Sequence, residues 1–192
     1  MRIVAGQLRG RPLAGPKDQG AKNAGLRPTS DRVREALFNI LAHGVPDFSI
    51  EGARVLDLFA GTGALGLEAI SRGAAYCLFV EDDADARGLI RENIEAFGLT
   101  GVTRIFKRDA TDLGRANQRD TGFSLVLCDP PYGRGLGERA LASAIAGGWL
   151  APGAVIVLEE RDGVEITLPS GLTEIDRRTW GDTQVVLARR GA

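Results

Sequence analysis

The stretch Arg54-Val-Leu-Asp57-Leu-Phe-Ala-Gly61-Thr-Gly63-Ala-Leu-Gly66 decides the fold. A short apolar run ends in an acid, and glycines follow it in the spacing G-x-G-x-x-G. Such a loop between a strand and a helix lets backbone N–H groups approach a ligand at the helix N-terminus. Glu81 follows about 20 residues later, where an acid can accept hydrogen bonds from ribose hydroxyls. Taken by themselves, the loop and Glu81 fit a dinucleotide site.

Segments of strand and helix character alternate after this stretch. Strands are predicted at 54–59, 76–80, 102–107, 123–128 and 154–159, and helices at 63–72, 83–97 and 136–147. The tail loses its helices and is predicted to form strands at 164–168, 173–179 and 184–188, the last two as a hairpin. Alternating strands and helices indicate an α/β fold with a mostly parallel sheet covered on both faces. The hairpin adds an antiparallel edge.

The first 50 residues differ from the rest in charge. Residues 1–34 have a net charge of +6 and the remaining residues −7, although the whole chain of 192 residues has a net charge of −1. The segment is predicted to be an extended arm of two short strands, then a loop, then a helix capped by Thr29 or Ser30. A basic arm on an acidic body predicts different partners for the two parts. We place the domain boundary between 1–50 and 51–192.

Four acids lie at the ends of four of the predicted strands: Asp57, Glu81, Asp109 and Asp129. The carboxyl ends of adjacent parallel strands line one crevice. Four carboxylates there would repel a pyrophosphate, since like charges at ~4 Å cost on the order of 4 kcal/mol at an effective dielectric constant near 20. They would attract S-adenosylmethionine, which carries an ammonium and a sulfonium, a ribose for Glu81 and an adenine for Asp109. The charge of the crevice therefore favours S-adenosylmethionine over a dinucleotide.

The fourth of these strands runs into Asp129-Pro130-Pro131-Tyr132. Two consecutive prolines fix φ and have no N–H to donate. The Asp129 carboxylate and the Pro130 carbonyl can therefore both accept hydrogen bonds from an NH2 group. Tyr132 offers a flat face on which a base can stack. All four residues of the motif are predicted to be catalytic.

At this point the sequence resembles a known group of enzymes. The Asp129–Tyr132 motif and the segment 56–63 are similar to those of S-adenosylmethionine-dependent methyltransferases that modify exocyclic amino groups. The segments 2–6, 9–11 and 26–41 narrow the resemblance to the bacterial 16S ribosomal RNA guanine-N2 methyltransferase family. The resemblance covers nearly the whole chain.

This resemblance implies a Rossmann-like class I methyltransferase fold with a seven-stranded sheet. It also implies methyl transfer to N2 of a specific guanine in 16S ribosomal RNA, within an assembling small-subunit particle, by a monomer. The chain has no apolar signal segment and no apolar run of ~18 residues. Cys77 and Cys128 lie in apolar runs and are predicted to be buried thiols. These features predict a cytoplasmic location and no membrane association.

The candidate contacts fall into two sets. The predicted cofactor contacts are Asp57, Phe59, Ala60, Gly61, Gly63, Glu81, Asp82, Asp109 and Ala110. The predicted contacts to RNA phosphates are Arg9, Arg11, Arg27, Arg32 and Arg34. No metal site is expected, because His43 is the only histidine and the cysteines have no metal-ligand spacing. Residues 17–25 and 111–121 match no motif.

Three alternatives stay open at this stage. A DNA adenine-N6 or protein glutamine methyltransferase shares the Pro-Pro-aromatic motif, although in those groups the motif more often begins with Asn than with Asp. A non-catalytic RNA-binding assembly factor would keep the fold with a vestigial pocket, against which the complete acid set argues. A nicotinamide oxidoreductase is disfavoured by the negative charge of the crevice.

Overall fold

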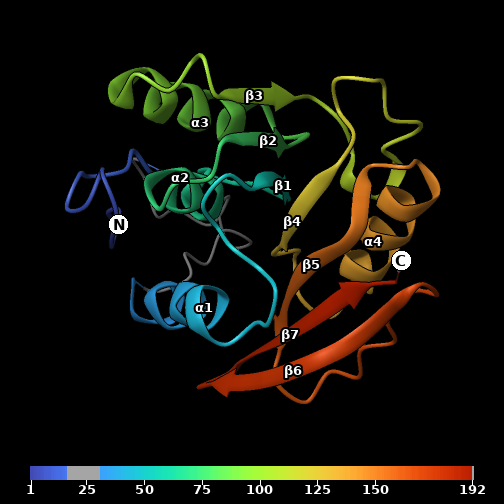
Figure 1. The fold of residues 1–192 in the computed structure, drawn as a ribbon. Helices are drawn as coiled ribbons and strands as arrows, with labels where there is room; N and C mark the ends of the chain where they lie inside the picture. The colour runs from blue at the N-terminus through green and yellow to red at the C-terminus, as the bar shows by residue number, and fades with distance from the viewer. Residues whose placement is uncertain (17–30, 192) are drawn as a thin grey trace.

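The computed structural model describes residues 1–16 and 31–191 and contains one seven-stranded sheet (Figure 1). The strand order is β3-β2-β1-β4-β5-β7-β6. The first five strands pair in parallel, whereas β7 runs antiparallel between β5 and β6. The strands are β1 (Arg54–Leu58), β2 (Tyr76–Val80), β3 (Thr103–Phe106), β4 (Phe123–Cys128), β5 (Leu150–Arg161), β6 (Leu172–Trp180) and β7 (Thr183–Arg190).

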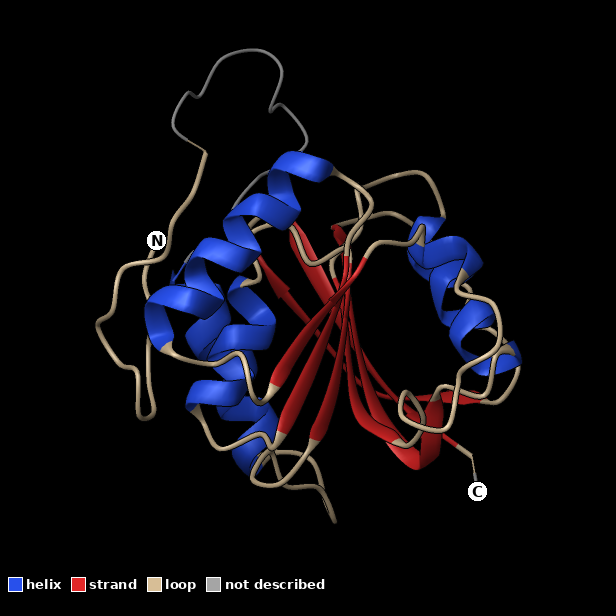
Figure 2. Cartoon of the chain, turned by 90° about the horizontal axis from the view of Figure 1, so that it is seen from above, coloured by secondary structure: helices blue, strands red, loops and turns tan. Residues whose placement is uncertain are grey.

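Helices cover both faces of the sheet, as Figure 2 shows. They are α1 (Asp31–His43), α2 (Ala64–Ser71), α3 (Ala84–Phe97) and α4 (Leu136–Ala146), together with the 3₁₀ helix η2 (Ala110–Asp112). Successive residues of a strand point to opposite faces, so Val55 packs with α1, α2 and α3, while Leu56 packs with α4. The predicted α/β fold with its C-terminal hairpin is confirmed. Among the described residues, no helix is long and apolar enough to cross a membrane.

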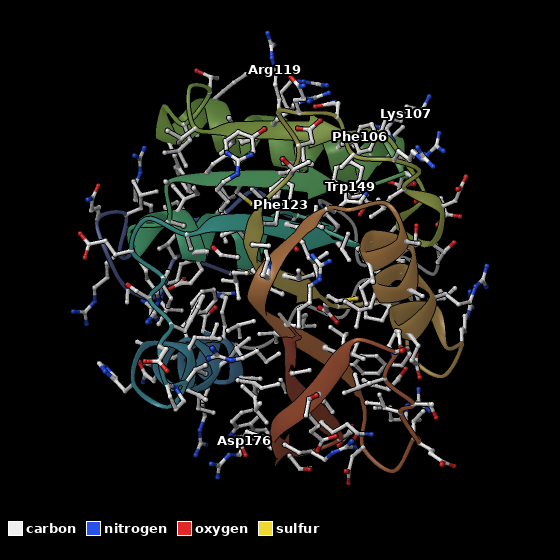
Figure 3. All side chains as sticks on the ribbon, turned by 45° about the vertical axis from the view of Figure 1, so that its right-hand side comes forward. Phe106, Lys107, Arg119, Phe123, Trp149 and Asp176 are labelled. Carbon is white, nitrogen blue, oxygen red and sulfur yellow. The ribbon has the colours of Figure 1, made fainter. Side chains whose placement is uncertain are left out.

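Aromatic rings fill part of the core on the α4 face. Trp149 lies with its ring centroid 5.8 Å from that of Phe106 and 6.4 Å from that of Phe123 (Figure 3). The indole N–H of Trp149 donates to the carbonyl of Gly114 at 2.9 Å, which satisfies its polar atom. Cys128 lies in the same core and Cys77 on the opposite face, both buried and free, as predicted.

Two details of the predicted strands are wrong. Residues 164–168 form no strand, although apolar and polar residues alternate there. Ile166 and Leu168 instead pack against the core on the α4 face. In the arm, the two predicted strands reduce to one isolated antiparallel bridge between Arg2 and Pro12.

The arm shares its core with the rest of the chain. Ile3 is fully buried and Leu13 nearly so, in the same cluster as residues of α1, α2 and β1. Gly6, at a φ of 82°, lies so close to α2 that an added Cβ would be 1.9 Å from the carbonyl oxygen of Ser71. The division into 1–50 and 51–192 stays a prediction about roles, because the hydrophobic packing is continuous across residue 50.

One buried carboxylate fixes the arm to α2. Glu68 is fully buried, and its oxygens accept hydrogen bonds from the backbone N–H of Val4 at 2.8 Å and of Ala5 at 3.0 Å. The same carboxylate pairs with Arg72 at 2.8 Å and with Arg34 at 3.6 Å. A buried charge is tolerated only when it is paired and hydrogen-bonded, and here the arm backbone supplies part of that environment.

Candidate active site

The carboxyl ends of four parallel strands lie in register at one edge of the sheet. Leu58 is paired with both Val80 and Cys128, and Val80 is paired with Phe106. The residues that follow these four therefore emerge side by side at this edge: Phe59, Glu81, Lys107 and Asp129. Two of the four predicted acids, Glu81 and Asp129, emerge directly at this edge. Asp57 lies within β1, one residue before Leu58, and Asp109 lies two residues beyond Lys107. We call this the carboxyl edge.

The glycine loop after β1 turns sharply into α2. Gly61 has a φ of 57° and Gly63 a φ of 78°, and Gly63 is the N-cap of α2. Phe59 also has a positive φ of 60°, which is uncommon for a residue with a side chain and is found at functional sites more often than elsewhere. The backbone N–H of Ala60 donates to the carbonyl of Val80 at 3.1 Å, which fixes the loop to β2.

Asp57 anchors the start of α2. Its side chain is buried, and its Oδ2 accepts a hydrogen bond from the backbone N–H of Gly66 at 2.9 Å. Residue 66 must be glycine, because a Cβ there would lie 2.4 Å from the Phe79 ring. Burial raises the pKa of Asp57 to about 7, the Gly66 N–H lowers it, and the charge of Glu81 raises it. Asp57 therefore stabilises the loop; a contact with the cofactor stays a prediction.

Glu81 joins the loops that follow β1 and β2. Its Oε2 accepts from the N–H of Gly61 at 2.8 Å, and its Oε1 accepts from the N–H of Asp83 at 2.9 Å. Burial raises the pKa of Glu81, against the lowering effect of these two N–H groups. A carboxylate oxygen has two acceptor positions, so each oxygen can accept one further hydrogen bond. Asp82 is exposed, and its carbonyl accepts from Arg87 at 2.6 Å.

Asp109 caps the 3₁₀ helix η2. Its Oδ1 accepts from both the backbone N–H and the hydroxyl of Thr111, each at 2.8 Å. These hydrogen bonds lower the pKa of the exposed Asp109 carboxyl, so it is ionised at neutral pH. Ala110, the next residue, is buried.

The motif Asp129–Tyr132 leaves the sheet at the end of β4. The backbone N–H of Asp129 donates to the carbonyl of Leu58 at 3.4 Å, which places the motif directly beside the start of the glycine loop. Asp129 is partly exposed, Pro130 is buried and Pro131 is exposed. The structure thus brings the predicted catalytic motif and the predicted cofactor loop to adjacent strands.

The hydroxyl of Tyr132 is held by groups that the sequence analysis did not identify. It donates a hydrogen bond to Glu159 of β5 and lies 3.3 Å from the hydroxyl of Thr183 of β7. Burial and the bond to Glu159 raise the pKa of Tyr132 above its ordinary value. The available signal was a pair of acids, Glu159 and Glu160, at the end of an otherwise apolar strand.

The predicted RNA contacts differ in their surroundings. Arg9 and Arg32 are exposed. Arg11 is also exposed, but its guanidinium lies 4.6 Å from the centre of the Phe97 ring and donates to the carbonyl of Ala96 at 2.6 Å. Arg27 lies outside the described residues.

Arg34 is not an RNA contact, contrary to the prediction. Its side chain is fully buried and pairs with Asp31 at 2.7 Å as well as with Glu68. The buried face of α1 consists of Arg34, Leu37, Phe38 and Leu41, which have the spacing of one helical face. Arg34 is therefore a structural residue.

Asn93 is a further polar residue of the site that was not predicted from the sequence. It is almost fully buried on α3, and its amide exchanges hydrogen bonds with the backbone of Ala14 in the arm at 2.7 and 3.3 Å. The same amide donates to the carbonyl of Thr62 in the glycine loop at 3.1 Å. The available signal was a lone amide on the apolar face formed by Ile90, Ile94 and Phe97.

The strand order and the antiparallel C-terminal hairpin give the chain a class I methyltransferase fold. A family model described as Conserved hypothetical protein 95 matches residues 1–189. The chain is 41% identical over 170 residues to Ribosomal RNA small subunit methyltransferase D of Escherichia coli strain K12, covering 88% of this chain and 78% of that protein. It is 33% identical over 182 residues to the Haemophilus influenzae protein of the same name, covering 94% and 89%.

Solved structures agree with this assignment. An Escherichia coli structure described as a candidate methyltransferase, yhhF, matches with a TM-score of 0.81 and 36% identity, covering 100% of this chain and 98% of that one. The chain therefore belongs to the Conserved hypothetical protein 95 family, the small-subunit ribosomal RNA methyltransferase family that the sequence resembles.

Proposed function

We propose that the protein transfers a methyl group from S-adenosylmethionine to the exocyclic N2 of a guanine in 16S ribosomal RNA. The observation that carries this proposal is the position of the motif Asp129–Tyr132, which lies at the end of β4 against the glycine loop after β1. The relatives named ribosomal RNA small subunit methyltransferase D support the substrate class.

The residues at the carboxyl edge fit S-adenosylmethionine, which supplies a methyl group bound to a cationic sulfur. Glu81 has acceptor positions for ribose hydroxyls. Asp109 and the backbone of Ala110 are assigned to the adenine edge. Gly61 and Gly63 let the backbone approach the methionine end. The remaining proposed contacts are Asp57, Phe59, Ala60 and Asp82.

The motif residues orient the amine. The lone pair of a guanine amino group is delocalised into the ring, so the group is a poor nucleophile. The Asp129 carboxylate and the Pro130 carbonyl each accept a hydrogen bond from one of its two N–H groups, which biases the nitrogen toward a tetrahedral geometry. Transfer of the methyl group would release S-adenosylhomocysteine, and the methylated nitrogen then loses one proton to solvent. The Tyr132 ring stacks on the base after it leaves its helix. Correct alignment can contribute ~7–11 kcal/mol to lowering the barrier, so Asp129 need not be a strong base.

The basic arm contributes the contacts to RNA. Arg9, Arg11 and Arg32 are exposed and are proposed to neutralise phosphates, together with Arg27. The target is proposed to be a 16S RNA segment in an assembling small subunit, methylated by a monomer in the cytoplasm.

The test is mass mapping of modified nucleosides in 16S RNA from cells with and without the gene. We expect one N2-methylguanosine to disappear without the gene and to return when purified protein and S-adenosylmethionine are added. No change in N2-methylguanosine would contradict the proposal. A lost N6-methyladenine in DNA, a lost methylglutamine in a protein, or no lost methyl group would identify the corresponding alternative. Calorimetry with S-adenosylhomocysteine and with NAD separates the methyltransferase from an oxidoreductase.

A further inference from the structure

Two consecutive buried acids end β5 beside the catalytic motif. Glu159 is 4% exposed and Glu160 is 3% exposed. Glu159 accepts the hydrogen bond from the Tyr132 hydroxyl. Glu160 accepts from the backbone N–H of Gly133 with both oxygens, at 2.9 and 3.1 Å. The two acids therefore bind two consecutive residues of the motif loop, one by its side chain and the other by its backbone.

The loop needs such support at this place. Gly133 has a φ of 73°, a conformation that glycine adopts readily because it has no Cβ. Glycine is also free to leave this conformation, so contacts with the surroundings must hold it there. Rotation of the Tyr132 side chain about its first side-chain bond would move the hydroxyl, so hydrogen bonds at the hydroxyl restrict that rotation. Thr183, 3.3 Å from the hydroxyl, extends from β7, the strand that pairs with β5. Tyr132 is thus held at its tip from two paired strands.

The burial of these acids suggests that they have more than a structural role. β5 is otherwise apolar in its centre, and a carboxylate placed in such surroundings costs stability unless it gains strong hydrogen bonds. An apolar residue at either position would complete the strand at lower cost. The hydrogen bonds of the two acids go to Tyr132 and Gly133, which lie in the same loop as Asp129 and Pro130. We assign Asp129 and Pro130 to the reacting amine.

We propose that Glu159 is a positioning residue that holds the Tyr132 ring in place for base stacking, and that Glu160 fixes the backbone of the same loop. This inference rests on the proposed function. A side chain that is already held at its hydroxyl loses less freedom when the base arrives, so the base is aligned with the methyl group in more of the encounters. The carboxylates act through Tyr132 and Gly133 and touch no reacting atom.

The first test is a set of single and double variants in the guanine methylation assay. Glu159→Ala and Tyr132→Phe each remove the hydrogen bond, and we expect each to lower kcat at least about 10-fold with little change in KM for S-adenosylmethionine. Glu159→Gln keeps an acceptor oxygen and should stay within about 3-fold of the wild type. The double variant Glu159→Ala/Tyr132→Phe should be no worse than the more severe single variant. Additive losses, or a Glu159→Ala enzyme with wild-type kcat, would overturn the inference.

The second test does not depend on activity. The chain contains two tyrosines, so protein labelled with ¹³C at the tyrosine Cζ gives two resonances, and Tyr132→Phe identifies the one from Tyr132. Glu159→Ala should shift or broaden that resonance and leave the one from Tyr76 in place, which reports on the folded state. Glu159→Gln and Glu165→Ala, a variant of an exposed acid in the next loop, should change it much less.

The two tests separate the two proposals. A wild-type protein that methylates no guanine would contradict the proposed function, while the tyrosine resonance would still report whether Glu159 fixes the ring. An unchanged Tyr132 resonance in Glu159→Ala would overturn the positioning role even if guanine methylation is found.

Discussion

The two halves of the carboxyl edge use carboxylates in different ways. In the half formed by the ends of β1 and β2, Asp57 and Glu81 hold the glycine loop through the N–H groups of Gly66 and Gly61. These are the same acids that the sequence assigns to the cofactor. In the half formed by the ends of β4 and β5, Glu159 and its neighbour hold the loop, and a different acid is assigned to the amine.

This difference has an experimental consequence. Where one carboxylate holds the loop and faces the ligand, a substitution changes both affinity and stability. Where the two tasks fall on different residues, as with Asp129 and Glu159, they can be removed one at a time. The following predictions test that contrast, beginning with the largest effect.

Asp129→Ala should remove most of the activity and little else. Loss of one positioned hydrogen-bonding group in an active site typically costs a factor of ~10² or more in turnover. The residue is partly exposed at the end of β4. We expect kcat for guanine methylation to fall by at least about 100-fold while the affinity for S-adenosylhomocysteine, measured by calorimetry, stays near the wild type. Unchanged turnover would contradict the role of Asp129.

Glu81→Ala should weaken cofactor binding and also lower stability. It removes the acceptor for the N–H of Gly61 and the proposed acceptor for ribose, and hydrogen bonds to charged groups contribute about 1.5–3 kcal/mol. We expect the affinity for S-adenosylhomocysteine to fall at least about 10-fold and the melting temperature to fall with it. Glu81→Gln keeps one acceptor oxygen, so its affinity and its melting temperature should lie between those of the wild type and those of Glu81→Ala. An unaltered affinity in calorimetry would exclude Glu81 from the cofactor site.

Asp57→Asn should change how stability depends on pH. The pKa of Asp57 is about 7 in the folded protein and 3.8 as its ordinary value, so between these values the folded state binds more protons than the unfolded state. Stability therefore falls as pH rises through this range. Asparagine cannot ionise and still offers an oxygen to the N–H of Gly66. Urea unfolding at pH 5 to 8 should show a smaller fall for the variant, and an equal fall in both proteins would contradict the buried ionisation.

Arg32→Ala should have the smallest effect. Each phosphate contact contributes about 0.7–0.9 to the slope of the logarithm of RNA affinity against the logarithm of salt concentration. We expect that slope to decrease in magnitude by about this amount, with catalysis at saturating RNA unchanged. Arg178→Ala, on the edge strand β6, is the matched control and should leave the slope as it is. A slope that Arg32→Ala does not alter would remove this residue from the proposed RNA surface.

Local patterns predicted the order of the elements well. The helix predicted at 83–97 ends in the structure at Gly98, which has a φ of 69° and is the C-cap of α3. Alternation alone did not distinguish a strand at 164–168 from a segment that packs Ile166 and Leu168 on the core. Alternation of apolar and polar residues shows that a segment has one buried and one exposed side. A strand also needs a neighbouring strand with which to form hydrogen bonds.

Only those parts of the site that follow from short stretches of sequence could be predicted. Register along parallel strands places Glu81 and Asp129 at one edge, and the sequence shows where each strand ends. The bond between Tyr132 and Glu159 joins residues 27 apart, and only the tertiary structure brings them together. Arg34 shows the opposite error, because a charged residue on a helix was expected to be exposed and is instead paired inside the core.

The contact between the arm and α2 limits how this protein can be recombined with its relatives. Glu68 binds two arm backbone groups, and the lack of a side chain at Gly6 is what lets the arm lie against Ser71. A grafted arm that did not lie on α2 in the same way would deprive the buried Glu68 of two of its hydrogen-bond donors. The arm and α2 therefore form one unit of exchange, and a chimera built to change the RNA target should carry both segments from the same parent.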